Sequence, residues 1–197
     1  MATRWLIGDS HSEGMQGYAR AAGWGVVAHR GWSTYSYAKG GGANLPDVTG
    51  ADVIVVALGS NDGDATALPS SMRTVVGQLR EQAPDARIFW VGPPDVTRSD
   101  LVPKMARVRA TQQDVAGELG VTWVDAVPFT GTGRASDGLH YTIGTGYKAF
   151  WRGIDGAAGA AGTTAEPGLV SSSGPAAIIA AVAAVVVLVV ALVWLSD

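Results

Sequence analysis

The sequence of 197 residues contains no cysteine. This absence excludes disulfide bonds, thiolate nucleophiles and zinc–thiolate sites. Cysteine usage therefore gives no information on whether the protein works in an oxidising or a reducing compartment. Basic residues are also scarce, because 14 Lys and Arg are outnumbered by 17 Asp and Glu, for a net charge of −3. Nucleic-acid binding needs a basic surface, so we expect no nucleic-acid partner. Histidine, the side chain best suited to move protons near neutral pH, occurs only as His11, His29 and His140.

The two ends of the chain differ in their relation to membranes. The first ten residues lack the basic flank and the long apolar region of a secretory signal peptide. Residues 176–195, by contrast, are all apolar and include no Gly or Pro. At about 1.5 Å per residue such a helix spans roughly 30 Å, the thickness of a bilayer core. We therefore expect a C-terminal transmembrane helix that anchors the protein in a lipid bilayer. Without a signal, the preceding residues are expected on the cytoplasmic side.

Between residue 1 and this run, apolar stretches alternate with amphipathic segments. The strongest strand signal is a continuous β-branched run at 52–58, typical of a central parallel strand buried on both faces. The other expected strands are 5–7, 24–28, 87–91 and 121–124. Helices are expected after residue 14 and over 68–79, 101–119 and 142–151. This alternation predicts an α/β domain at 1–153 with a parallel sheet of about five strands. The Gly-, Ala-, Ser- and Thr-rich residues 154–175 are expected to form a flexible linker.

A serine lies where the first expected strand turns into the first expected helix, in Gly8-Asp9-Ser10. At such a turn Ser10 lies at the carboxyl edge of the sheet, and its N–H lies at a helix N-terminus that can hold an anion. Gly-Asp-Ser is also a common turn, and Asp or Ser is a common helix N-cap. Ser10 is therefore a candidate nucleophile that depends on partners at the same edge. Asp9 is expected to stabilise the turn through local backbone N–H groups.

Those partners follow the other strands. Asp137 and His140 follow the last strand, and a separation of three residues on one loop lets the carboxylate reach the far ring nitrogen of the histidine. This arrangement orients an imidazole as a general base for a serine nucleophile. Gly31 follows the second strand and Asn61 the third. We expect a Ser10–His140–Asp137 triad, with an oxyanion hole formed by the N–H groups of Ser10 and Gly31 and the side-chain amide of Asn61.

Four sequence blocks now carry a family resemblance. They are Gly8-Asp9-Ser10, Gly31 within the stretch at 30–36, Gly59-Ser60-Asn61-Asp62, and Asp137-Gly138-Leu139-His140. In this order they resemble the SGNH (GDSL-type) hydrolase family, and residues 29–62 resemble its rhamnogalacturonan acetylesterase-like branch. The resemblance covers about residues 3–152. It implies a flavodoxin-like three-layer fold and ester hydrolysis through an acyl-enzyme without a metal or cofactor. Gly40, Gly41 and Gly42 compete with Gly31 for the oxyanion position.

Several aromatic side chains surround the second block. Trp32 and Tyr35, with Tyr37, are candidates for a wall on which a sugar ring stacks, although packing against the sheet edge is an equal alternative. His11 and His29 have no carboxylate at a useful spacing, so we expect them at the surface or behind the site.

Acidic residues near the third block raise the question of a metal. Asp62 and Asp64 could form a cation site with Asp137. Two acids in a Gly-rich loop are usually solvated, however, so we expect no metal.

These observations predict a membrane-anchored serine esterase. Its expected substrates are short-chain, acetyl-like esters, either small molecules or esters on a carbohydrate or an envelope component. The alternative is a catalytically silent protein of the same fold. Such a protein would bind a glycan or serve as a membrane-attached structural module, for example in a membrane-containing virus particle. A binding role needs no complete set of catalytic groups, which favours the esterase.

Overall fold

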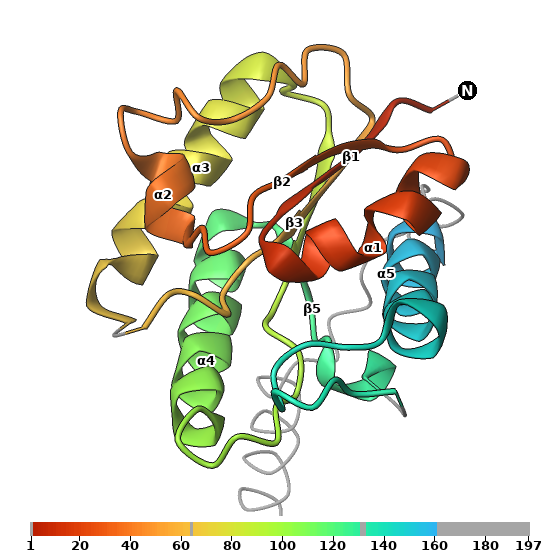
Figure 1. The fold of residues 1–197 in the computed structure, drawn as a ribbon. Coiled ribbons are helices and arrows are strands. Elements are labelled where there is room, and N and C mark those ends of the chain that lie inside the picture. Colours follow the sequence, from red (N-terminus) through yellow and green to blue (C-terminus); the bar gives the residue numbers. More distant parts are fainter. Residues whose placement is uncertain (1, 64, 131–132, 161–197) are drawn as a thin grey trace, which may run out of the picture. The chain divides into compact units, whose positions relative to one another are not determined.

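The computed structural model describes residues 2–63, 65–130 and 133–160. In this part of the chain five parallel strands form one sheet in the order β2-β1-β3-β4-β5. The strands are β1 Arg4–Gly8, β2 Gly25–Ala28, β3 Val53–Ala57, β4 Arg87–Val91 and β5 Thr122–Val124. This is the strand order of flavodoxin-like folds, in which ligands bind beyond the carboxyl ends of the strands at the β1/β3 switch point. The expected parallel α/β domain is confirmed (Figure 1).

The central strand β3 explains why the sheet has two apolar faces. All five of its residues are buried, and it pairs with both β1 and β4. Successive side chains of a strand point to opposite faces. Ile54 and Val56 therefore join one core cluster, while Val53 and Val55 join the other. A continuous β-branched run thus supplies both cores.

Helices cover both faces and complete three layers (Figure 1). Core contacts place α1 and α5 on one face and α2, α3 and α4 on the other. Their bounds are α1 Ser10–Ala21, α2 Thr34–Ala38, α3 Leu68–Gln82, α4 Val102–Leu119 and α5 Lys148–Ala160. Pro lies near the start of α3 and of α4, where its missing N–H would have no helical partner in any case.

Short helical segments lie between several of these elements. The residues after β2, 31–44, contain the five-residue helix α2, which begins at a capping box formed by Ser33 and Ser36. Two 3₁₀ turns, Ala65–Ala67 and Val127–Phe129, follow β3 and β5. A π-helical turn, Ile143–Tyr147, leads directly into α5. Such π turns occur often at functional sites.

Helix α5 corrects the expected domain boundary at residue 153. The helix continues through Ala160, so residues 154–160 are helical and are not part of a linker. Phe150, Ile154 and Ala158 recur at a spacing of four and are buried in the core against the sheet. The rest of the expected linker and the expected transmembrane helix at 176–195 lie outside the described residues. Among the helices that the structure does describe, none is long and apolar enough to cross a membrane.

Candidate active site

The β1–α1 turn presents Ser10 as the first residue of a helix. Asp9 is the N-cap of α1, and its Oδ1 accepts a hydrogen bond of 2.9 Å from the His11 N–H. A side chain at Gly8 would clash with Ser12 and with the carbonyl of Ala57 at the end of β3. Ser10 is 8% exposed, and its N–H is among those that an α-helix leaves without a partner. The turn is therefore built to hold Ser10 at the sheet edge, as predicted.

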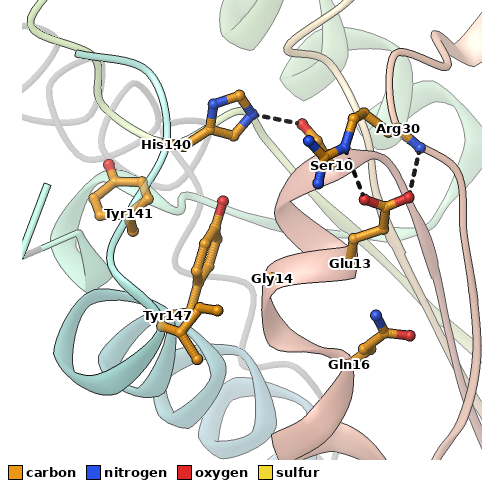
Figure 2. A pocket seen from close by; sticks show the side chains of 9 residues that line it. Ser10, Glu13, Gly14, Gln16, Arg30, His140, Tyr141 and Tyr147 are labelled. Carbon is orange, nitrogen blue, oxygen red and sulfur yellow. Dashed lines mark hydrogen bonds and ion pairs between the residues drawn. The ribbon is translucent and has the colours of Figure 1, made fainter. Parts of the chain in front are cut away.

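Ser10, His140 and Asp137 form one continuous chain of hydrogen bonds. The distance from Ser10 Oγ to His140 Nε2 is 2.9 Å, and that from His140 Nδ1 to Asp137 Oδ2 is 2.6 Å (Figure 2 shows the first of these). The other carboxylate oxygen of Asp137 accepts the backbone N–H groups of Leu139 and His140, each at 2.9 Å. The hydrogen bond to the His140 ring, followed by these two, holds the pKa of Asp137 well below its usual range. A histidine oriented in this way can take the proton of a serine hydroxyl.

His11 is buried next to this chain of hydrogen bonds. Its ring centroid is 5.3 Å from that of His140, and the side chain is 2% exposed. Burial, with the nearby His140 as a smaller cause, lowers the pKa of His11 to about 3, so the imidazole stays neutral. His11 was expected either at the surface or behind the site, and its burial shows that the surface position is wrong. His29 lies elsewhere, with its ring stacked on Trp32 at 4.0 Å.

Asn61 follows β3 and reaches toward the β1–α1 turn. Its Nδ2 donates to the carbonyl oxygen of Trp32 at 3.1 Å and lies 3.5 Å from Asp9 Oδ2. Asp9 itself is 1% exposed, and burial raises its pKa to about 7. The Asn61 amide is thus held near the residue that precedes Ser10.

The neighbouring Asp62 is engaged by α2. Its two carboxylate oxygens accept the Thr34 N–H at 2.8 Å and the Thr34 hydroxyl at 2.7 Å. Among the residues that the structure describes, no group of three His, Asp or Glu side chains is arranged to hold a metal ion. Asp64 lies outside that set.

Gly31 lies in a tight turn after β2. The His29 N–H donates to the Gly8 carbonyl at 3.0 Å, and the Trp32 N–H closes the turn on the His29 carbonyl at 3.1 Å. The φ of Gly31 is +76°. A positive φ at the third position is typical of a type II turn and favours glycine there. Gly40, Gly41 and Gly42 also have positive φ, but they follow α2, and a side chain at Gly42 would clash with Gln78 of α3.

A pocket of about 460 Å³ opens at Ser10 and His140. Its polar wall comes from α1 and the β2 loop, and its apolar wall comes from the segment after His140 (Figure 2). The polar wall contains Glu13, Gln16 and Arg30; the apolar wall contains Tyr141, Ile143 and Tyr147. None of these six residues was among the site residues expected from the sequence. Helical spacing could have indicated Glu13, and also Gly14, which lines the pocket too. Residues three and four positions after Ser10 lie on the same face of the helix as Ser10.

The expected aromatic wall is placed differently. Tyr35 is 57% exposed on α2 and lines a separate surface pocket with Lys39 and Ser70. Trp32 stacks on His29 and meets Tyr37 edge to face. Tyr37 is buried and donates to the Gly8 carbonyl at 2.7 Å. The structure therefore brings neither Trp32 nor Tyr35 into the pocket around Ser10. The Trp32 ring packs against His29 and Tyr37, whereas Tyr35 is exposed on α2.

Comparison with known proteins agrees with this geometry. Residues 6–149 match the model of the GDSL-like lipase/acylhydrolase family. No curated protein matches the chain.

Solved structures share the fold at low sequence identity. An extracellular lipase from Streptomyces rimosus superposes with a TM-score of 0.64 at 14% identity, over 80% of this chain and 100% of the lipase. A phospholipase A1 from Streptomyces albidoflavus NA297 has a TM-score of 0.62 at 14% identity, over 79% and 99% of the two chains. A carbohydrate acetylesterase family member from Sinorhizobium meliloti has a TM-score of 0.60 at 21% identity, over 80% and 97%. With most of the domain matched to the family and a Ser10–His140 pair at the sheet edge, this chain belongs to the GDSL-like lipase/acylhydrolase family of ester hydrolases.

Proposed function

We propose that this protein is a serine esterase in which Ser10 is the nucleophile, His140 the general base and Asp137 the residue that orients His140. Ser10 Oγ attacks the ester carbonyl carbon while His140 Nε2 takes the hydroxyl proton. The bond to the alcohol oxygen then breaks, and the imidazolium gives that proton to the departing alcohol. Water attacks the acyl-enzyme by the same route and restores Ser10. The observation that carries this proposal is the unbroken chain from Ser10 Oγ through His140 to Asp137.

The oxyanion hole in this proposal consists of the Ser10 N–H, the Gly31 N–H and the Asn61 side-chain amide. A helix N-terminus favours negative charge, which supports the Ser10 N–H. Arg30, the residue before Gly31, lines the same pocket as Ser10, which favours Gly31 over Gly40, Gly41 and Gly42. Asn61 Nδ2 holds one firm contact to Trp32 and one long contact of 3.5 Å to Asp9, so one N–H can turn to the oxyanion at little cost.

For the substrate we propose a short-chain, acetyl-like ester of a polar alcohol, such as a carbohydrate or an envelope component. The pocket supports this choice because its two walls differ in chemistry. The apolar wall, with Ile143 and Tyr147, suits a small acyl group, while Glu13, Gln16 and Arg30 suit hydroxyl groups. The resemblance to the rhamnogalacturonan acetylesterase-like branch and the likeness to a carbohydrate acetylesterase family member point the same way.

We further propose that the apolar run at 176–195 anchors this domain to a lipid bilayer. Its length and its lack of charge support a spanning helix. Carbonate extraction of membranes from expressing cells tests the anchor. Protease protection in sealed vesicles tests on which side residues 1–160 lie, the cytoplasmic side being the expectation.

A fluorophosphonate probe tests the serine chemistry directly. The wild-type protein is expected to react with the probe at Ser10 and to hydrolyse 4-nitrophenyl acetate. Ser10→Ala should lose both activities and keep its fold, while Ser70→Ala, a serine on α3, serves as the matched control. A wild-type protein that neither reacts nor turns over would instead support the silent binding module.

A further inference from the structure

We infer that Glu13 is a positioning residue for the oxyanion hole, acting by tying the turn that carries Gly31 to the helix that carries Ser10. This inference rests on the proposed function, because it takes the Ser10 and Gly31 N–H groups as oxyanion donors. Those two donors come from different elements, the N-terminus of α1 and the loop after β2. A hole made of two elements works only if something holds the spacing between them.

Glu13 makes that connection with both of its carboxylate oxygens. Oε1 accepts the backbone N–H of Arg30 at 3.0 Å, and Oε2 contacts Arg30 Nε at 3.1 Å (Figure 2). Glu13 lies on α1 one helical turn after Ser10, and Arg30 directly precedes Gly31. The Glu13 carboxylate thus links Arg30, the residue before Gly31, to the helix that begins with Ser10.

The remaining contacts of the turn leave this task to Glu13. The His29 N–H bonds to Gly8 in β1, and the Trp32 N–H bonds back to His29 within the turn itself. These bonds hold the start of the turn and close it, whereas the tip at Arg30 and Gly31 is exposed. Among the contacts that the structure describes, those of Glu13 are the ones that join the tip to α1.

The exposure of the pair separates positioning from stability. The Arg30 side chain is 81% exposed and that of Glu13 is 27% exposed. Exposed ion pairs contribute little to stability, so the fold does not depend on this one. Catalysis is far more sensitive, because a displacement of about 1 Å at a reacting centre can cost on the order of 100-fold in rate. The loss of Glu13 should therefore appear in turnover before it appears in unfolding.

Glu13 and Arg30 also line the pocket, and a direct contact to substrate is the rival explanation. The two explanations differ in which kinetic constant responds. A donor that meets only the oxyanion changes kcat and leaves KM in place, whereas a contact to bound substrate raises KM. The two explanations also differ in how strongly each variant should impair turnover. Arg30→Ala removes the guanidinium but keeps the backbone N–H that Glu13 binds, so under a positioning role it should impair turnover less than Glu13→Ala does.

The test measures kcat, KM and the inhibition constant of a trifluoromethyl ketone, whose adduct carries an oxyanion. Glu13→Ala is expected to lower kcat about 10- to 100-fold with KM within about twofold, and to weaken the ketone by a similar factor. Glu13→Gln keeps an acceptor for the Arg30 N–H and should recover most of the loss. Arg30→Ala should fall between Glu13→Ala and the wild type.

The exposed pair Arg73–Glu118 provides a matched control between α3 and α4. Glu118→Ala should leave kcat, KM and ketone affinity unchanged. The inference is overturned if Glu13→Ala keeps wild-type kcat, or if Glu13→Ala and Arg30→Ala raise KM alike at constant kcat. It is also overturned if Glu13→Ala lowers the melting temperature by more than a few degrees and turnover only in proportion to unfolding. A wild-type protein without esterase activity refutes the proposed function itself, which is a separate and recognisable outcome.

Discussion

Asp9 and His11 are joined by a hydrogen bond of 2.9 Å from the His11 N–H to Asp9 Oδ1, and both side chains are buried against the same small cavity. Burial acts on them in opposite ways. It raises the pKa of Asp9 to about 7 and lowers the pKa of His11 to about 3. Both groups are therefore neutral between about pH 3 and pH 7, next to Ser10, the proposed nucleophile.

The first prediction concerns stability between pH 4 and 6.5, where both groups titrate on unfolding. The native state keeps a proton on Asp9 that the unfolded chain has released, so this group makes stability fall as pH rises. In this range His11 is protonated in the unfolded chain but neutral in the native state, so this group makes stability rise with pH. Asp9→Asn should therefore give a melting temperature that rises with pH, and His11→Gln one that falls. Circular dichroism melts at several pH values measure the slopes, and equal signs in the two variants would contradict the assignment.

The second prediction concerns the orientation of His140. Asp137→Asn keeps an acceptor for the backbone N–H groups but places an amide N–H opposite His140 Nδ1, which favours the tautomer that cannot accept the Ser10 proton. We expect kcat to fall about 10²- to 10⁴-fold, less than for Ser10→Ala. His140→Ala should approach the loss seen with Ser10→Ala. Steady-state hydrolysis of 4-nitrophenyl acetate provides the comparison, and an Asp137→Asn variant with wild-type kcat would exclude Asp137 from the mechanism.

The third prediction concerns the contact between α1 and the apolar wall of the pocket. A methyl group at Gly14 would overlap the ring of Tyr147, whereas one at Gly17 on the same helix would meet nothing within 4 Å. Gly14→Ala should therefore lower stability by about 1–3 kcal/mol and raise KM, because Tyr147 must move. Gly17→Ala should raise stability by about 0.5–1 kcal/mol without a change in KM. Urea unfolding and KM together check the pair, and similar effects of both variants would show that Tyr147 does not shape the pocket.

The sequence predicted those parts of the site that depend on local spacing. Ser10 lies on a strand-to-helix turn, and Asp137 and His140 share one loop, so neighbours in the chain define their geometry. The pocket walls were missed because they depend on contacts between distant segments. Tyr147, the last residue of the π-helical turn before α5, meets Gly14 only once this turn packs beside α1, and no pattern within either segment indicates it.

Composition concealed a second feature, the C-terminal half of α5. Residues 153–160 are rich in Gly and Ala, which is typical of a linker, yet Ile154 and Ala158 continue the buried face begun by Phe150. At this helix a spacing of four decides the structure, and the content of small residues does not. For Trp32 and Tyr35 both interpretations were available from the sequence. The stacking on His29 and the exposure of α2 that distinguish them arise only in the fold.

The fourth prediction tests whether residues 154–160 belong to the domain. Ile154 is 1% exposed in the core between α5 and the sheet. Ile154→Ala should therefore cost about 2–5 kcal/mol of stability and leave kcat of the folded enzyme unchanged. Val102→Ala, at a side chain that is 44% exposed, should cost less than about 1 kcal/mol. Equal and small effects of the two variants in denaturant unfolding would return residues 154–160 to the linker.

The fifth prediction identifies the oxyanion glycine by comparing two positions with the same backbone strain. Gly31 and Gly41 have φ of +76° and +69°, and a methyl group at either would meet nothing within 4 Å. Alanine at either position should therefore cost about 1–2 kcal/mol through the left-handed conformation alone. The Gly31 N–H is the proposed donor to the oxyanion. A rotation of its peptide that relieves the strain would therefore disturb catalysis at Gly31 but not at Gly41. Gly31→Ala should then lower kcat at least tenfold, while Gly41→Ala should lower only the melting temperature. If kcat falls with Gly41→Ala and persists with Gly31→Ala, the donor lies in the glycine cluster after α2, and the turn tied by Glu13 has another role.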